Sequence, residues 1–202
     1  MNEIYSLRQI CDEEFFQRDT LEVAKSLIGM VILYRGRAIR VSEVEAYRGK
    51  DDPASHGFGG ISPRNKTMFG PPGHIYVYLS YGIHHCLNIV AEMAGSPSGI
   101  LVRAGEPLEY HKAGSKVRVI GPSKEREPLS SVGPGRLGRY LNVKLSDDGI
   151  DICRNDQGIS LFAVLEAASK VIKATPRIGI TKGTELEWRF VDSDSSYLSK
   201  GR

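Results

Sequence analysis

The chain has 202 residues, of which 41% are hydrophobic and 25% are charged, and its formal net charge is +3 at pH 7. These values fit one globular domain, and no apolar run reaches the roughly 20 residues that a membrane helix needs. The charge permits binding to a polyanion without indicating it. We expect a single domain over residues 1–202 with a frayed polar tail at 193–202, and no contact with a membrane.

The cysteines and the first residues indicate a reducing compartment. Cys11, Cys86 and Cys153 are odd in number and far apart, and no CxxC pair occurs. This pattern favours free thiols over a disulfide framework. The chain starts without the basic and apolar segments of a signal peptide. We expect a cytoplasmic protein, or a nuclear one in a eukaryote.

The first predicted helix begins after Asp19. Glu22 follows three residues later in a capping-box pattern, an apolar face comes next, and Gly29 is placed to end the helix. Strands are predicted at 30–34 and 39–47.

The middle of the chain predicts a long loop and a hairpin. Residues 51–72 are rich in Gly, Pro, Ser and Asn, and loops of this length are usually functional. Residues 74–79 and 84–90 predict two strands around a turn at 80–83.

Short strands dominate the remainder. We predict a strand at 99–104, an irregular stretch at 106–131 and a short helix at 134–141. Four more strand candidates follow, at 159–164, 170–174, 178–180 and 188–191. Strands outnumber helices and are not separated by regular crossover helices. We therefore predict an α+β domain on a curved, mostly antiparallel sheet with a protruding β-hairpin.

Glu45 lies in the strand segment VSEVEAY at 41–47. Alternation along an extended strand puts Glu45 on the same face as Ile39 and Val41. A carboxylate in that register either reaches water at the rim of the sheet or is held in a pocket for a purpose.

Arg103 interrupts an apolar run that otherwise predicts a buried strand. A buried guanidinium needs a carboxylate partner or a bound anion. A pair with Glu45, or with Glu43, explains both the carboxylate among apolar residues and the guanidinium in an apolar run. Such a pair can be purely structural or catalytic.

Three tyrosines form a second unusual feature. Tyr76 and Tyr78 share one face of a predicted strand, and Tyr81 lies at the predicted turn beside Gly82. An aromatic side chain at a loop tip suits a wedge that enters a base step in DNA. The alternative is ordinary packing on a sheet surface.

Basic residues flank these elements, and three of them are candidates for contact with a DNA backbone: Arg64, Lys66 and Arg136. The segment GPG at 133–135 is a weak phosphate signal, and a plain turn into a helix fits it better. His84 and Cys86 alternate onto one strand face, but no second ligand pair has suitable spacing, so we expect no metal. No GxSxG nucleophile motif occurs.

Four stretches together resemble the alkyladenine (3-methyladenine) DNA glycosylase family. They are EVEAYRGKDDPASHG at 43–57, PRNKTMF at 63–69, PPGHIYVYLSYGIHHCLN at 71–88 and GILVRAGEP at 99–107. Looser matches cover most of the rest, including RIGI at 177–180. The resemblance implies one α+β domain, a monomer, that binds double-stranded DNA.

The resemblance also implies roles for individual residues. Glu45 matches the family's catalytic base, and Arg103 matches the arginine that helps to hold that glutamate and the attacking water. Tyr47, His56 and Tyr78 match residues that sandwich or hydrogen-bond the extruded base. Tyr81 matches the tyrosine that fills the gap in the duplex, and Asn88 matches the asparagine at the pocket floor.

The implied reaction is hydrolysis of the N-glycosidic bond of an alkylated or deaminated purine, without a cofactor, leaving an abasic site. In a bacterium such an enzyme acts on the nucleoid. His84, His85 and the stretch 108–128 depart from the family pattern, which affects DNA contacts more than catalysis. Two alternatives remain open: a non-catalytic sensor of distorted duplex, and a metal-dependent nuclease or phosphatase that uses Glu43, Glu45 and nearby aspartates.

Overall fold

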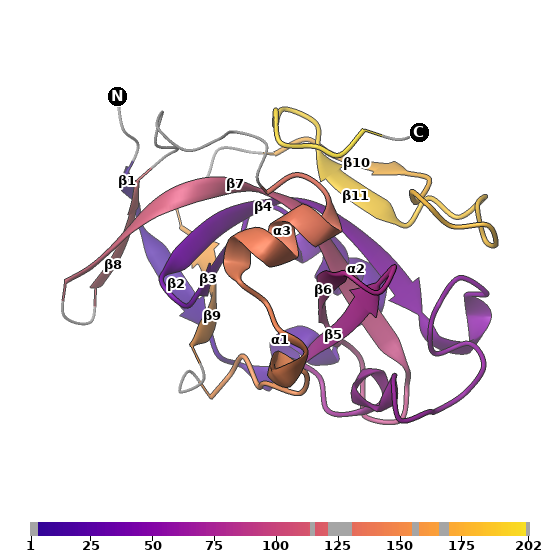
Figure 1. Cartoon of the computed structure of the whole chain (residues 1–202). Helices are drawn as coiled ribbons and strands as arrows, with labels where there is room; N and C mark the ends of the chain where they lie inside the picture. Colours follow the sequence, from indigo (N-terminus) through magenta and orange to yellow (C-terminus); the bar gives the residue numbers. More distant parts are fainter. Residues whose placement is uncertain (1–3, 114–115, 121–130, 155–157, 166–169, 201–202) are drawn as a thin grey trace.

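The computed structural model describes residues 4–113, 116–120, 131–154, 158–165 and 170–200 (Figure 1). Its strands are β1 (Ile4–Tyr5), β2 (Leu7–Ile10), β3 (Val31–Tyr34), β4 (Arg37–Arg48), β5 (Ile75–Ser80), β6 (His84–Ile89), β7 (Ser98–Ala113), β8 (Lys116–Ile120), β9 (Ile159–Val164), β10 (Ile172–Thr175) and β11 (Arg189–Asp192). Its α-helices are α1 (Glu13–Gln17), α2 (Thr20–Leu27) and α3 (Pro134–Leu141). None of the helices in the described part of the chain is long and apolar enough to cross a membrane.

The strands form one sheet in which every pairing is antiparallel. The main path runs β1-β8-β7-β4-β3-β9-β2, with the β5–β6 hairpin joined to β7 and the β10–β11 pair joined to β4. The predicted mostly antiparallel sheet is confirmed. Figure 1 shows β4 and β7 side by side through the middle of the molecule, where both bend along their length.

A β-bulge in β4 changes which side chains face the core. The pairing with β7 shifts register between Val41 and Val44. Val41 and Val44 both belong to the main hydrophobic cluster, so the side chains of Glu43 and Glu45 lie on the other face. The prediction that Glu45 shares a face with Val41 is therefore wrong, because the extra residue of a bulge reverses the alternation beyond it.

The helix boundaries follow the sequence signals. The Asp19 carboxylate accepts the N–H groups of Leu21 and Glu22 at the start of α2, and Gly29 follows its end with φ +77°. Helix α3 spans the predicted residues and lies against β6. The contact is so close that a Cβ atom on Gly138 would lie 1.9 Å from the His85 carbonyl oxygen.

The central loop and hairpin are also as predicted. Strands β5 and β6 pair from Ile75 with Ile89 to Ser80 with His84. The long connection before them contains only two 3-10 turns, Gly49–Asp51 and Lys66–Phe69. Ile75 and Val77 face the main core, whereas Tyr76 packs on the opposite side with Met68 and Val90.

Two predicted stretches differ in the structure. The stretch 106–131 is not irregular throughout, because β7 continues to Ala113 and pairs with β8; residues 114–115 and 121–130 lie outside the described residues. Residues 178–180 form no strand, since Gly179 has φ +79° and the Ile178 N–H is bonded to a side chain instead of a strand neighbour. Helix α1 and strands β1 and β2 are further elements that lie outside the predicted ranges.

The approach of α3 to β6 predicts the effect of one methyl group. Gly138→Ala should lower the free energy of unfolding by about 1–3 kcal/mol, the usual cost of overpacking. This cost exceeds the gain of up to about 1 kcal/mol in helix propensity. Urea unfolding measures it, and Arg139→Ala at the next, exposed position is the control. Equal stability of the two variants would contradict the packing argument.

Candidate functional site

Two carboxylates of β4 are completely buried beside one guanidinium. Glu43 and Glu45 have 0% exposure, and Arg103 of β7 has 7%. The Arg103 Nε donates to Glu43 Oε1 at 3.0 Å, and Nη1 donates to Glu45 Oε2 at 3.1 Å. The predicted pairing of Arg103 is confirmed, and it involves both glutamates. Burial lowers the pKa of Arg103, but the charges of Glu45 and Glu43 outweigh it and raise that pKa overall.

Glu45 receives donors from three different segments. Besides Arg103, the Tyr47 hydroxyl donates to Oε2 at 2.7 Å and the Ile178 N–H donates to Oε1 at 2.7 Å. Burial of the phenol, followed by the adjacent charge of Glu45, raises the pKa of Tyr47. Tyr47 therefore stays protonated and acts as a donor to the carboxylate.

Glu43 is held by β11 and by the end of the chain. Arg189 Nε donates to Glu43 Oε1 at 2.7 Å. The Ser199 N–H donates to Oε2 at 2.6 Å and its hydroxyl donates to Oε1 at 2.5 Å. The Ser42 hydroxyl also donates to the Tyr197 carbonyl at 2.5 Å. The predicted fraying after residue 192 thus does not describe this segment, because buried Glu43 draws donors from it.

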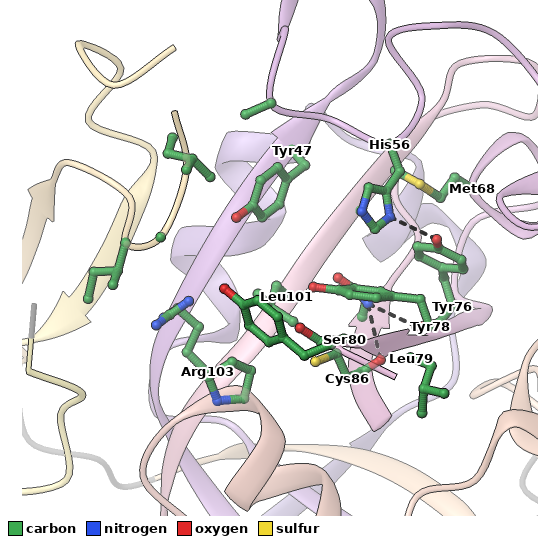
Figure 2. A pocket seen from close by; sticks show the side chains of 18 of the residues that line it. Tyr47, His56, Met68, Tyr76, Tyr78, Leu79, Ser80, Cys86, Leu101 and Arg103 are labelled. Carbon is green, nitrogen blue, oxygen red and sulfur yellow. Dashed lines mark hydrogen bonds between the residues drawn. The ribbon is translucent and has the colours of Figure 1, made fainter. Parts of the chain in front are cut away.

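A pocket of about 630 Å³ opens next to Arg103 (Figure 2). The predicted residues that it brings together are Tyr47, His56, Arg64, Tyr78, Tyr81, Asn88 and Arg103. The side chains that Figure 2 labels come from β4, the long loop, the hairpin and β7, and they surround one space. Glu45 lies behind this lining, in contact with Tyr47 and Arg103.

One wall of the pocket consists of aromatic rings that contact one another. His56 Nδ1 and the Tyr76 hydroxyl share a hydrogen bond of 2.9 Å, and the His56 and Tyr78 rings meet edge to face with centroids 4.6 Å apart. Partial burial, aided by the charge of Arg64, lowers the pKa of His56 below 6.5. Burial raises the pKa of Tyr76 to about 12. Both shifts favour the neutral forms of these side chains.

Asn88 is a buried residue of the pocket lining, and hydrogen bonds hold its amide. Its Nδ2 donates to the Tyr76 carbonyl at 3.0 Å and to the Cys86 carbonyl at 3.3 Å. Both acceptors belong to the hairpin strands, so the orientation of this side chain is set by the backbone around it.

The hairpin tip presents apolar side chains to solvent. Tyr81 is 91% exposed with φ +51°, and Ile83 is also exposed. Arg64 lies at the rim of the pocket and donates to the Leu79 carbonyl at 3.2 Å. Lys66 and Arg136 are exposed but do not line the pocket.

In the described part of the chain, no three His, Cys, Asp or Glu side chains gather as metal ligands. Glu43 and Glu45 instead face guanidinium groups. The alternative of a metal-dependent nuclease or phosphatase therefore finds no ligand set among these residues.

Sequence reasoning missed four contributors to the site: Asp52, Arg177, Ile178 and Ser199. Asp52 and Arg177 form a buried ion pair, and residues 178–182 form one wall of the pocket. The only signal for this wall is the loose family match of RIGI at 177–180. Ser199 carries no sequence signal, because a lone serine in a polar tail has no distinguishing pattern.

Comparisons with known proteins agree on one family. Residues 14–196 match the model of the family described as methylpurine-DNA glycosylase. A protein of Rhodopseudomonas palustris, provisionally named 3-methyladenine DNA glycosylase, is 44% identical over 92% of this chain and 86% of its own. Proteins with the same provisional name from Methanocella arvoryzae and Rickettsia felis are 39% and 41% identical, over 95% and 90% of this chain and 96% and 92% of theirs.

The contacts of the tail predict a stabilising role for Ser199. Ser199→Ala should lower the free energy of unfolding by about 1.5–3 kcal/mol, because buried Glu43 loses a hydroxyl donor. The matched control is Ser196→Ala at an exposed position of the same segment. Chemical denaturation of both variants measures the effect, and identical midpoints would show that the Ser199 hydroxyl contributes nothing to stability.

Proposed function

Because the chain belongs to the methylpurine-DNA glycosylase family, we propose that it excises alkylated or deaminated purines of the 3-methyladenine, 7-methylguanine and hypoxanthine type from duplex DNA. Family membership makes the chain a DNA glycosylase, a hydrolase of base excision repair with DNA as its substrate. The observation that carries the proposal is the buried Glu45 carboxylate, which is bonded to Arg103 at the edge of an aromatic pocket.

The pocket supports recognition of an extruded base. A purine inside a duplex is unreachable, so the enzyme must unstack it at a cost of a few kcal/mol. Tyr47, His56 and Tyr78 then offer ring faces and edges on both sides of the cavity. A cationic alkylated purine gains about 0.5–2 kcal/mol from such rings. A weakly paired lesion also costs less to extrude than a normal base, which adds selectivity.

Glu45 is the proposed general base. Its carboxylate accepts a proton from water as the water oxygen bonds to the sugar C1′. The C1′–N bond breaks, and its electron pair leaves with the purine. The sugar passes through an oxocarbenium-like state, which the negative charge of Glu45 stabilises. Arg103 orients the carboxylate through its hydrogen bond to Glu45 Oε2, and the product is an intact abasic site.

Tyr81 is the proposed wedge of the hairpin. Its ring stands in solvent at the tip of β5 and β6, beside the mouth of the pocket. Inserted into the duplex, it occupies the space that the extruded base leaves. Arg64, Lys66 and Arg136 are the proposed contacts to the DNA backbone, and the enzyme acts as a monomer.

Loss of the Glu45 carboxylate charge should abolish excision. We expect Glu45→Gln to lower the single-turnover rate by at least about 100-fold, the usual contribution of a general base. The assay uses end-labelled duplex with one hypoxanthine or one alkylated purine, in EDTA, and scores alkali-sensitive sites. Glu14→Gln, at an exposed position of α1, is the control.

Three outcomes contradict parts of this proposal. Native-rate release by folded Glu45→Gln excludes Glu45 as the base. Tight duplex binding without release by the native protein favours the non-catalytic sensor. Strand breaks without alkali indicate an amine nucleophile, for which Lys182 in the pocket lining is the candidate.

Removal of the wedge should weaken binding to damaged DNA. Tyr81→Ala is expected to lower affinity for a lesion-containing duplex by about tenfold, within the range of one lost stacking contact. Met93→Ala removes another exposed apolar side chain that lies outside the pocket lining, and should leave affinity unchanged. Equal losses in both variants would show a general surface effect.

A further inference from the structure

Asp52 and Arg177 form an ion pair with no exposed side-chain surface. Arg177 Nη1 donates to Asp52 Oδ2 at 2.5 Å, and Nη2 donates to Oδ1 at 2.8 Å. This is the bidentate geometry in which a guanidinium binds a carboxylate most specifically. The pair lies 125 residues apart in sequence, so it ties the long loop to the segment before β11.

The pair also holds the backbone of the segments around it. Asp52 accepts the N–H groups of Arg48 at 3.4 Å and Ala54 at 3.0 Å. Arg177 donates to the Ala46 carbonyl at 2.9 Å and to the Gly183 carbonyl at 3.4 Å. Strand β4, the loop that carries His56 and the segment 177–183 are thus fixed against one another.

The guanidinium group of Arg177 lies over two aromatic rings. Its guanidinium carbon lies 4.7 Å from the centroid of the Tyr47 ring and 5.3 Å from that of Trp188. The Tyr47 ring is a wall of the pocket, and its hydroxyl donates to Glu45. The position of Arg177 therefore sets the position of a donor to the proposed base.

The peptide that follows Arg177 contacts the same carboxylate directly. The Ile178 N–H donates to Glu45 Oε1, opposite the oxygen that receives Arg103 and Tyr47. Ile178 lies in a segment without regular secondary structure, so its N–H keeps a fixed orientation only if neighbouring contacts hold the segment. The contacts of Arg177, the preceding residue, hold it.

Stability alone is a weak reason for this arrangement. Replacing a buried ion pair with apolar side chains of similar volume is often neutral or stabilising. Among the described residues, the buried Arg177 Nε also has no hydrogen-bond acceptor, so the pair is not fully satisfied. The geometry of the ion pair instead fits a role in orienting neighbouring groups.

We propose that Asp52 and Arg177 are positioning residues for Glu45, acting through the Ile178 N–H and the Tyr47 ring. The inference rests on the proposed function, since it assigns the pair to the same reaction. It predicts that loss of the pair slows bond cleavage without a matching loss of DNA binding, because neither side chain reaches the surface.

The test compares Asp52→Asn, Arg177→Lys and Arg177→Met with native protein and Glu45→Gln. Single-turnover release of hypoxanthine is measured at saturating protein, and affinity is measured with a duplex carrying a tetrahydrofuran abasic analogue. We expect a loss of at least about tenfold in rate for Asp52→Asn and Arg177→Met, with affinity within about threefold of native. Arg177→Lys keeps the positive charge but cannot form the bidentate contact with Asp52. Its rate of hypoxanthine release should therefore fall between those of the native protein and Arg177→Met.

A matched control separates positioning from stability. Asp147, with 1% side-chain exposure, is bound by both Nη groups of Arg35 and lies outside the pocket lining. Asp147→Asn should lower the unfolding temperature without changing the excision rate below that temperature. Trp188 is the single tryptophan of the chain, so its emission reports directly on Arg177 and should change in the Arg177 variants but not in Asp147→Asn.

The outcomes distinguish the two proposals. If native protein releases base and the folded Asp52 and Arg177 variants match its rate, the positioning role is wrong while the proposed function stands. Rate and affinity that fall in proportion also overturn it, because the pair then serves binding alone. If native protein releases no base, the proposed function and this inference both fail. Should the Met variant not fold, the comparison of Arg177→Lys with Asp147→Asn decides.

Discussion

The middle of β4 carries charge into the interior of a sheet, and the surrounding structure must neutralise it. Two adjacent like charges, Glu43 and Glu45, have no exposed surface, which is costly unless each carboxylate is paired and hydrogen-bonded. Each partner comes from a different part of the chain: Arg103 from β7, Arg189 from β11, Ile178 from an irregular segment and Ser199 from the tail. Satisfying two carboxylates thus requires four segments to converge.

The same constraint explains irregular features of the backbone. In a regular β4, the side chains of Glu43 and Glu45 would point into the hydrophobic cluster that contains Val41. Apolar side chains there could not donate hydrogen bonds to the carboxylates. The bulge turns them to the other face, and Val44 takes the core position. Segment 177–183 likewise avoids strand pairing, which leaves the Ile178 N–H free to bind Glu45. These two irregular backbone segments allow the buried carboxylates to form hydrogen bonds.

This arrangement divides the site into a rigid, buried part that holds Glu45 and a surface that lines the pocket. Beneath the pocket, donors from several elements fix the Glu45 carboxylate, a degree of preorganisation that electrostatic catalysis requires. The rings of Tyr47 and Tyr78 contribute neutral side chains to the pocket lining, because burial raises the pKa of both phenols. At the tip of the hairpin, the side chain of Tyr81 is exposed to solvent. The change from rigid buried charge to an exposed ring agrees with the proposed extrusion of a base and hydrolysis of its glycosidic bond.

Local signals in the sequence determined the cap at Asp19, the hairpin, helix α3, the antiparallel class of the sheet and the need of Arg103 for a carboxylate. These features depend on residues close in the chain or on one buried charge, so pattern and propensity are enough. The tertiary structure alone decided that both glutamates share Arg103, that the bulge reverses their face, and that Arg177 and Ser199 complete the site. Those contacts join residues between 58 and 156 positions apart in the sequence or depend on one extra residue in a strand. Nothing in a local pattern encodes which distant donor a buried carboxylate will find.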